Sequence, residues 1–165
     1  MNTKHLLDLI KYNSKMEITD LASALNECEQ DVKDTLKDLE KNKVICGYHT
    51  LINWDKTNTD HVMAMIEVKV TPEREYGYDR IAKSIYRYPE VDTMYLLSGN
   101  TEFIVIIHGR TMQEVAQFVG SKLACIPAVT GTSTAFVLKQ YKVDGVVFDE
   151  EKERQERLLV TPWLI

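Results

Sequence analysis

The spacing of apolar residues changes partway along the chain, and this change restricts the fold more than any other feature. Up to about Trp54 the apolar residues recur every three or four positions, as in Val32, Leu36 and Leu39, which is the period of amphipathic helices. Over residues 62–70 they recur at every second position, the period of a β-strand with one buried face. We therefore expect a helical domain followed by a domain built on a sheet.

The first domain, residues 1–54, is predicted to be a winged helix-turn-helix. Three apolar faces indicate three short helices, and only a few residues separate the second from the third, as in a helix-turn-helix. Thr19 is expected to cap the second helix. The β-branched and aromatic residues of 44–54 predict a strand or hairpin, the wing. The faces consist of Leu6, Leu7 and Ile10, of Leu21, Ala22 and Leu25, and of Val32, Leu36 and Leu39.

The polar, turn-forming residues 55–61 are the expected linker. Residues 62–143 are predicted to fold in the order βαββαβ, which is that of a ferredoxin-like α+β domain of the dimeric α/β-barrel type, with both helices on one face of an antiparallel sheet. Thr111, with Glu114 three residues later, is expected to cap the second of these helices. The expected strands are 61–71, 90–99, 101–109 and 129–143, and the expected helices are 76–88 and 111–126.

The strands of this second domain carry apolar residues on both faces, as in the stretch FIVII. Its two helices cover one face, so we expect a second copy of the chain to cover the other. This predicts a homodimer, assembling further into a tetramer or octamer. The tail, residues 144–165, combines a charged run with an apolar end, and we expect that end to dock on its own or a neighbouring subunit.

Composition excludes several classes of function. The net charge of −5 is unfavourable for a protein that is basic over its whole surface, so any contact with DNA phosphates must be local. No apolar stretch approaches the length of a membrane span and the N-terminus lacks a secretory pattern, so we expect a cytoplasmic protein with no membrane contact. The three cysteines lack metal-ligand spacing, and we expect no disulfide, metal or cofactor.

Two groups of motifs resemble one known family. The stretch from LASAL to VICGY, residues 21–48, and the stretch VDTMYLLSGNTEFIVIIHG, residues 91–109, are similar to the Lrp/AsnC, or feast/famine, transcription regulators. The resemblance covers nearly the whole chain. It implies a winged helix-turn-helix that binds double-stranded DNA and a C-terminal RAM domain that binds an amino acid or a related small molecule.

The recognition helix departs from the family pattern at three positions. A thiol is a poor helix cap, so we expect Asn26 with Glu29 to form an alternative capping box that starts the helix slightly early. Asn42 or Lys43 must end the helix. The departures are Cys28, where the family usually has Ser, Thr35, where it usually has Arg, and Lys43, where it usually has Gly.

The recognition helix also carries more acid than base, since residues 27–42 hold six carboxylates and three lysines. The carboxylates stabilise the helix N-terminus, or they bind cytosines, or DNA binding has been lost. If the helix docks, Gln30 and Lys33 are the expected base contacts, and Lys37, Lys41 and Lys43 the expected phosphate contacts. The full predicted DNA surface is Cys28, Glu29, Gln30, Lys33, Asp34, Lys37, Lys41 and Lys43.

The resemblance also places the effector at the turn between two strands. Backbone N–H groups and hydroxyls there can hold a carboxylate, and Glu102 can hold an ammonium group. The alternative interpretation is a plain tight hairpin turn in which Gly99 and Asn100 adopt positive φ. The predicted ligand contacts are Ser98, Gly99, Asn100, Thr101 and Glu102 from the turn, with Thr132 and Thr134 from the last strand.

Two further functions are weighed against a ligand-responsive DNA-binding regulator. The acidic recognition helix favours a ligand sensor whose DNA-binding domain is degenerate. An enzymatic function is suggested by family members that resemble siroheme decarboxylases, but we expect no catalytic residues because the histidines are scattered without partners. These are His5, His49, His61 and His108.

Overall fold

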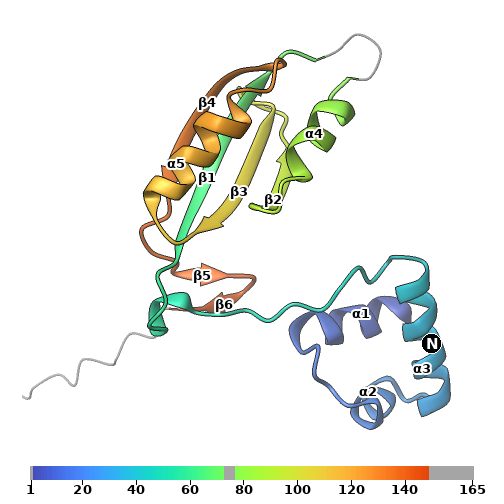
Figure 1. The fold of residues 1–165 in the computed structure, drawn as a ribbon. Coiled ribbons are helices and arrows are strands. Elements are labelled where there is room, and N and C mark those ends of the chain that lie inside the picture. Colours follow the sequence, from blue (N-terminus) through green and yellow to red (C-terminus); the bar gives the residue numbers. More distant parts are fainter. Residues whose placement is uncertain (1, 73–76, 149–165) are drawn as a thin grey trace, which may run out of the picture. The chain divides into compact units, whose positions relative to one another are not determined.

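The computed structural model describes residues 2–72 and 77–148 of the 165-residue chain (Figure 1). The chain divides into two compact units, Met1–Ile52 and Asn53–Ile165, called unit 1 and unit 2 below. The expected fold class, a helix-turn-helix joined to a ferredoxin-like domain, is confirmed. No helix in the two described ranges is both long and apolar enough to cross a membrane.

Unit 1 contains the three predicted helices around one small core. They are α1 (Thr3–Tyr12), α2 (Ile18–Leu25) and α3 (Glu29–Lys41). Apolar side chains from all three helices meet, because each helix is apolar along one face only. The fully enclosed members are Leu6, Leu21, Ala22 and Val32, and Leu9, Ile10, Leu25, Leu36 and Leu39 pack around them.

The helix ends of unit 1 correct two predictions. Glu17, not Thr19, is the N-cap of α2, and Thr19 lies inside the first turn, where its carbonyl accepts a hydrogen bond from Ser23. The early start of α3 at Asn26 is also wrong. Asn26 is the left-handed C-cap of α2, with φ 54°, and Cys28 caps α3 through its Sγ, which accepts from the Asp31 N–H at 3.4 Å.

The predicted wing is not formed within the described part of this single chain. Residues 44–53 have no strand assignment, and Trp54 begins a short 3₁₀ turn, η1 (Trp54–Lys56). The sequence of this segment suits a strand, but a strand also requires a neighbouring strand to which its N–H and C=O groups can bond. Composition alone does not provide that partner.

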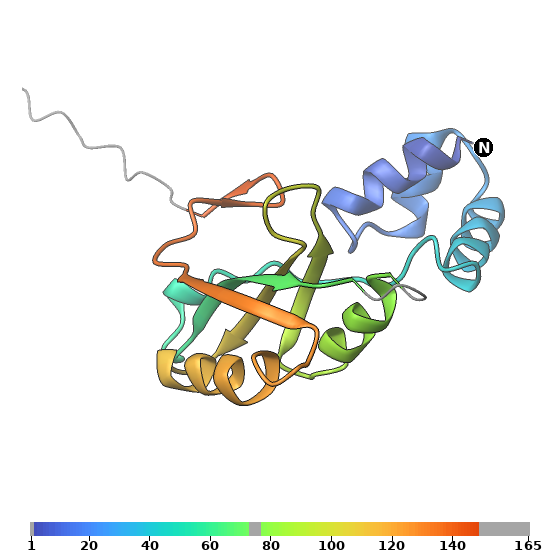
Figure 2. The same cartoon turned by 90° about the horizontal axis from the view of Figure 1, so that it is seen from above.

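Unit 2 is built on a four-stranded antiparallel sheet with the order β2-β3-β1-β4. Its strands are β1 (Val62–Val70), β2 (Val91–Leu96), β3 (Phe103–Gly109) and β4 (Val129–Phe136). Two helices, α4 (Asp79–Tyr86) and α5 (Met112–Phe118), lie on the same face of the sheet, as Figure 2 shows. The predicted cap of α5 is confirmed, since the Thr111 hydroxyl accepts from the Glu114 N–H at 3.1 Å.

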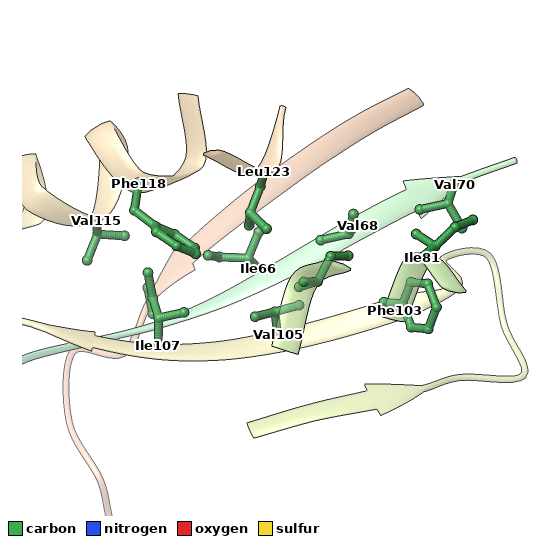
Figure 3. Packing of buried hydrophobic residues seen from close by; sticks show 12 residues of the cluster. Ile66, Val68, Val70, Ile81, Phe103, Val105, Ile107, Val115, Phe118 and Leu123 are labelled. Carbon is green, nitrogen blue, oxygen red and sulfur yellow. The ribbon is translucent and has the colours of Figure 1, made fainter. Parts of the chain in front are cut away.

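Alternating burial along β1 places the core of unit 2. Ala64, Ile66 and Val68 are fully buried against the helices, whereas Met65 and Glu67, on the opposite face, are exposed. Figure 3 shows how the buried side chains of β1 and β3 meet those of α4, α5 and the residues after α5. One face of the sheet is therefore filled by its own helices, as predicted.

Two features of unit 2 were not predicted. The helix expected to run to residue 126 changes after Phe118 into a π-helical turn, η2 (Val119–Leu123). The chain after β4 forms a small hairpin, β5 (Lys142–Val143) and β6 (Val146–Val147), in which Asp144 and Gly145 both have positive φ, as a type I′ turn requires. The apolar end of the expected tail, residues 158–165, lies outside the described residues.

The C-terminus of α3 yields a test of stability. The Val44 N–H donates to the Leu39 carbonyl at 2.9 Å, and the Lys43 N–H donates to the Glu40 carbonyl at 3.1 Å. These two bonds form a Schellman motif, in which Lys43 has a φ of 58°. We expect Lys43→Gly to raise the free energy of unfolding of unit 1 by about 1 kcal/mol, because Gly adopts positive φ without strain.

Urea denaturation followed by far-UV circular dichroism measures this effect. The matched control is Lys41→Gly, which removes the same side chain inside the helix and should lower stability by about 1 kcal/mol. Equal destabilisation by both substitutions would contradict the role assigned to position 43.

Candidate effector site and recognition helix

The predicted DNA surface lies on the exposed side of α3 and at its two ends. Val32 is buried and Leu36 and Leu39 pack beside it, so the opposite side of the helix faces solvent. The structure leaves every predicted contact exposed. These residues are Cys28, Glu29, Gln30, Lys33, Asp34, Lys37, Lys41 and Lys43.

The charges on α3 fall into two rows. Lys33, Lys37 and Lys41 are four residues apart and therefore line one side of the exposed surface. The carboxylates spaced at i, i+3 and i+7 line the neighbouring side of the same surface. These carboxylates are Asp31, Asp34 and Asp38. These three aspartates are therefore separated from the continuous row of lysines, whereas Glu29 extends the lysine row by one turn at its N-terminal end.

Carboxylates also engage the two predicted base contacts. The Gln30 amide donates to Asp34 at 3.0 Å, and the Lys33 ammonium lies 3.6 Å from the Glu29 carboxylate. Exposed pairs of this kind contribute only about 0.2–0.5 kcal/mol each, so a DNA base or phosphate can displace them. The carboxylates orient these side chains without locking them.

The predicted effector turn is a loop of six residues. It runs from Leu97 to Glu102 and is closed by a hydrogen bond from the Leu97 N–H to the Glu102 carbonyl at 2.7 Å. Ser98, Gly99 and Asn100 are exposed. Neither Gly99 nor Asn100 has positive φ, so this detail of the plain-hairpin interpretation is wrong, and the effector site at this turn stays a prediction.

The other two turn residues point back onto β1. Thr101 is 8% exposed, and its hydroxyl lies 3.5 Å from the Glu67 carboxylate. Glu102 accepts a hydrogen bond from the Val70 N–H at 2.9 Å through one carboxylate oxygen. The turn is therefore held to the central strand by two side chains, and a second carboxylate, that of Glu67, lies beside it.

The last strand presents its hydroxyls on both faces of the sheet. Thr132 and Thr134 pair with Val68 and Ile66, and opposed residues of an antiparallel pair point to the same face, which here is the helix-covered one. Ser133 pairs with Glu67 on the open face. Within one chain the structure thus groups Glu67, Thr101 and Ser133, while Thr132 and Thr134 belong to the other face.

Glu67 and Ser133 were missed by the sequence analysis. Their sequence signal is the period of two along each strand, which assigns charged and polar residues between buried ones to the open face. The pairing register that brings Glu67 opposite Ser133 depends on tertiary structure and is not visible in the sequence.

Two of the four histidines, expected to be scattered, are stacked together. The Trp54 and His61 rings lie 4.8 Å apart and the His61 and His108 rings 4.9 Å apart. His108 also lies 3.7 Å from the Asp92 carboxylate. Burial and the nearby His108 lower the pKa of His61, and Asp55 partly opposes this shift. The expectation of isolated histidines is therefore wrong for this pair.

A helix-turn-helix joined to a βαββαβ domain with a polar interstrand turn defines a class of two-domain transcriptional regulators. Residues 63–147 match the family model of the Lrp/AsnC ligand binding domain. Over 158 residues the chain is 40% identical to the HTH-type transcriptional regulator YugG of Bacillus subtilis, an alignment that covers 95% of each chain. The chain therefore belongs to the Lrp/AsnC family of DNA-binding regulators.

Solved structures show the same fold. A transcriptional regulator of Neisseria meningitidis, determined in complex with L-Met, has a TM-score of 0.66 and 24% identity, covering 84% of this chain and 88% of that one. AsnC of E. coli has a TM-score of 0.65 and 15% identity, covering 84% of this chain and 91% of that one.

The stacked histidines predict a pH dependence of stability. Because the pKa of His61 is lower in the folded protein than the ordinary value of 6.5, the unfolded chain binds this proton more readily. His61 therefore contributes to stability above about pH 6.5, and the contribution is lost as pH falls through the folded pKa. We expect His61→Phe, which keeps a ring in the stack, to reduce the loss of melting temperature between about pH 7.5 and pH 5.

Differential scanning calorimetry of the full chain measures this dependence. His5→Phe, at an exposed position on α1, is the control and should leave the dependence unchanged. An identical pH profile for His61→Phe and the wild type would refute the role of His61.

Proposed function

We propose that this protein binds double-stranded DNA through α3 and that an amino acid or a related small molecule, bound at the turn between β2 and β3, modulates this binding. The observation that carries the DNA part is the row of exposed lysines on the second helix of a helix-turn-helix. The regulator acts in the cytoplasm and has no membrane partner.

DNA binding uses the two rows of α3 differently. Gln30 suits adenine and Lys33 suits guanine in the major groove, and both exchange their weak intrahelical partners for bases. Lys37, Lys41 and Lys43 contact phosphates. Because binding is confined to one row of lysines, affinity is weak per domain, and its salt dependence is limited to the few phosphate contacts that the row makes.

A second copy of the chain raises this weak affinity. The open face of the sheet carries Met63, Met65, Ile104 and Ile106. In the single chain, 37% of the Met65 surface is exposed. Apolar side chains in a continuous group of this kind favour burial against a partner. We infer a homodimer, assembling to a tetramer or octamer, which binds several DNA half-sites at once and gains affinity by multivalency.

The effector binds where the turn meets β1. The Glu67 and Glu102 carboxylates suit an ammonium group, and the backbone N–H groups of the exposed Ser98–Asn100 segment suit a carboxylate. The two ends of an amino acid match this pair of charges. The Neisseria relative was crystallised with L-Met, so methionine belongs in the first panel of effectors.

Ligand binding changes DNA binding by a shift between two states of the assembly. A ligand that contacts the turn differently in the two states favours the state it binds more tightly, and DNA affinity changes by the same coupling factor. Thr132 and Thr134 contribute to this site only where a neighbouring subunit presents its helix-covered face to the turn.

The row of aspartates favours a second candidate function, a ligand sensor without DNA binding. Under this alternative, Thr35→Arg creates DNA affinity that the wild type lacks, since it restores the residue usual in the family. We propose further that the chain is not an enzyme. A bound tetrapyrrole, seen as a visible absorbance band of the purified protein, would contradict this.

The lysine row gives a quantitative test. We expect Lys37→Gln to weaken binding to the DNA upstream of its own gene and to reduce the slope of log K against log salt by about one, because one phosphate contact is lost. Fluorescence anisotropy over a salt series measures both quantities. Lys83→Gln, at an exposed position on α4, removes the same charge and is the control; it should change neither the affinity nor the slope. Equal slopes for Lys37→Gln and the wild type would remove Lys37 from the interface.

The effector site has its own test. We expect Glu102→Gln to lower amino-acid affinity at least about tenfold, because it removes the charge that faces the ammonium group. The amide oxygen can still accept from the Val70 N–H, so the fold should persist. Isothermal titration calorimetry measures the affinity.

Gly99→Ala is the control in the same turn. A Cβ at Gly99 has no neighbour within 4 Å, and its φ is not positive, so the substitution should preserve both folding and the backbone N–H groups. Full amino-acid affinity in Glu102→Gln would rule out the proposed contact.

A further inference from the structure

A cavity of about 370 Å³ lies on the helix-covered side of unit 2, away from the effector turn. It is lined by the C-terminal end of β3, including Ile107 and Gly109, whereas the effector turn precedes the N-terminal end of this strand. The remaining walls come from α5, from η2 and from Glu90, which immediately precedes β2. Its polar lining consists of Glu90, His108, Glu114, Gln117, Ser121 and Lys122.

The Lys122 side chain occupies a setting that suits an ammonium group. Its Nζ lies 5.2 Å from the centre of the Tyr88 ring and 5.5 Å from that of Phe118, and it bonds the Glu90 carboxylate. The two rings meet edge to face, with centres 5.7 Å apart. A carboxylate with two aromatic rings is the combination that binds organic cations in proteins.

Glu90 has unused capacity to accept hydrogen bonds. The hydrogen bond from Lys122 lowers the pKa of Glu90, so the group is a carboxylate at neutral pH. One oxygen, Oε2, is covered from solvent and has no hydrogen bond from a side chain among the described residues, although the Glu90 side chain as a whole is 36% exposed and its own backbone N–H also lowers the pKa. A carboxylate accepts about four hydrogen bonds when fully satisfied, and a buried acceptor without a partner is unfavourable.

The backbone around Lys122 is also unusual. Lys122 lies in the π-helical turn η2, and π turns are rare and frequent at functional sites. Ser121, from the same turn, lines the cavity as well. Glu90, Phe118 and the π turn thus line the cavity together, and Tyr88, which is not part of that lining, packs against Phe118 and the Lys122 ammonium.

We propose that Glu90, Tyr88 and Phe118 form a binding site for the ammonium group of a small primary amine, and that Lys122 occupies this site when the amine is absent. The amine displaces the Lys122 ammonium, and its three N–H donors serve both oxygens of Glu90. Its short carbon chain lies against Ile107, Val115 and Phe118, which line the cavity. This site is independent of the DNA surface and of the effector turn.

Charge in the cavity determines the class of ligand. With Lys122 displaced, the titratable lining consists of the carboxylates of Glu90 and Glu114 and the imidazole of His108, so acid predominates and the lining favours a cation over an anion. A diamine fits this distribution, because its second ammonium can approach Glu114. An amino-acid carboxylate would face carboxylates on both sides.

The test titrates the full-length protein with cadaverine, using 1,5-pentanediol as an uncharged probe of the same length. We expect Lys122→Met, whose side chain has no charge by which Glu90 could hold it over the two rings, to bind cadaverine about tenfold more tightly than the wild type, since the competing ammonium is gone. Glu90→Gln should bind at least about tenfold more weakly than Lys122→Met. Asp8→Asn, at an exposed position on α1, should bind as the wild type does.

Isothermal titration calorimetry gives the affinities, and the melting temperature of each variant shows that it is folded. A purely structural role for Lys122 predicts a less stable Lys122→Met protein with no gain in affinity. That result overturns the proposal, as does equal binding of cadaverine and 1,5-pentanediol by Lys122→Met.

Discussion

The burial of alternate residues along β1 is the constraint on which unit 2 depends. β1 is a central strand, paired with β3 on one side and β4 on the other, so its side chains fix both neighbours. Ala64, Ile66 and Val68 are fully buried, and sliding the register by one residue would move them all to the open face. The same alternation assigns Met65 and Glu67 to that open face, so the core and the candidate effector site have one cause.

The effector turn takes its position from this strand as well. Glu102 extends the pairing of β1 and β3 by one hydrogen bond, made by a side chain to the Val70 N–H. Thr101 turns toward Glu67 and is almost fully covered. The exposed residues between Leu97 and Thr101 are thus supported at one end by a rigid element. A loop supported in this way can present backbone N–H groups without ordering itself on binding.

The fold followed from the sequence where periodicity decides structure. The three helices of unit 1 and the four strands of unit 2 each have a clear apolar period, and the existence of each was predicted, although the last strand was expected to run to residue 143 and β4 ends at Phe136. The helix caps were harder to predict, because both Asn26 and Cys28 could cap α3 from the same turn. In the structure Asn26 ends α2 in the left-handed region and Cys28 caps α3. The prediction of a strand over residues 44–54 was wrong, because a strand forms only where a second segment pairs with it.

The candidate sites could be predicted only in part from the sequence. Sites made of neighbouring residues were predicted, and contacts between residues far apart in the chain were not. The turn residues are consecutive, so a motif shows them together. Other contacts join segments that no motif connects. These are the stack of Trp54, His61 and His108 and the contact of Glu90 with Lys122. Such contacts depend on the pairing register and on the π turn after α5, neither of which has a reliable pattern in a single sequence.

The carboxylates of the recognition helix have a structural role, and the exposed row of lysines is kept beside them. Carboxylates near the N-terminus of α3 interact favourably with the helix dipole, by about 0.3–1 kcal/mol each, in a helix whose cap is a thiol rather than a hydroxyl. The pairs they form with Gln30 and Lys33 are weak and exposed. In the docking proposed for α3, its carboxylates repel phosphates in any misplaced complex, so they penalise nonspecific complexes more than a well-registered one. Under that proposal, acid on this surface favours selectivity at the expense of affinity, and the proposed assembly with several recognition helices can tolerate that loss.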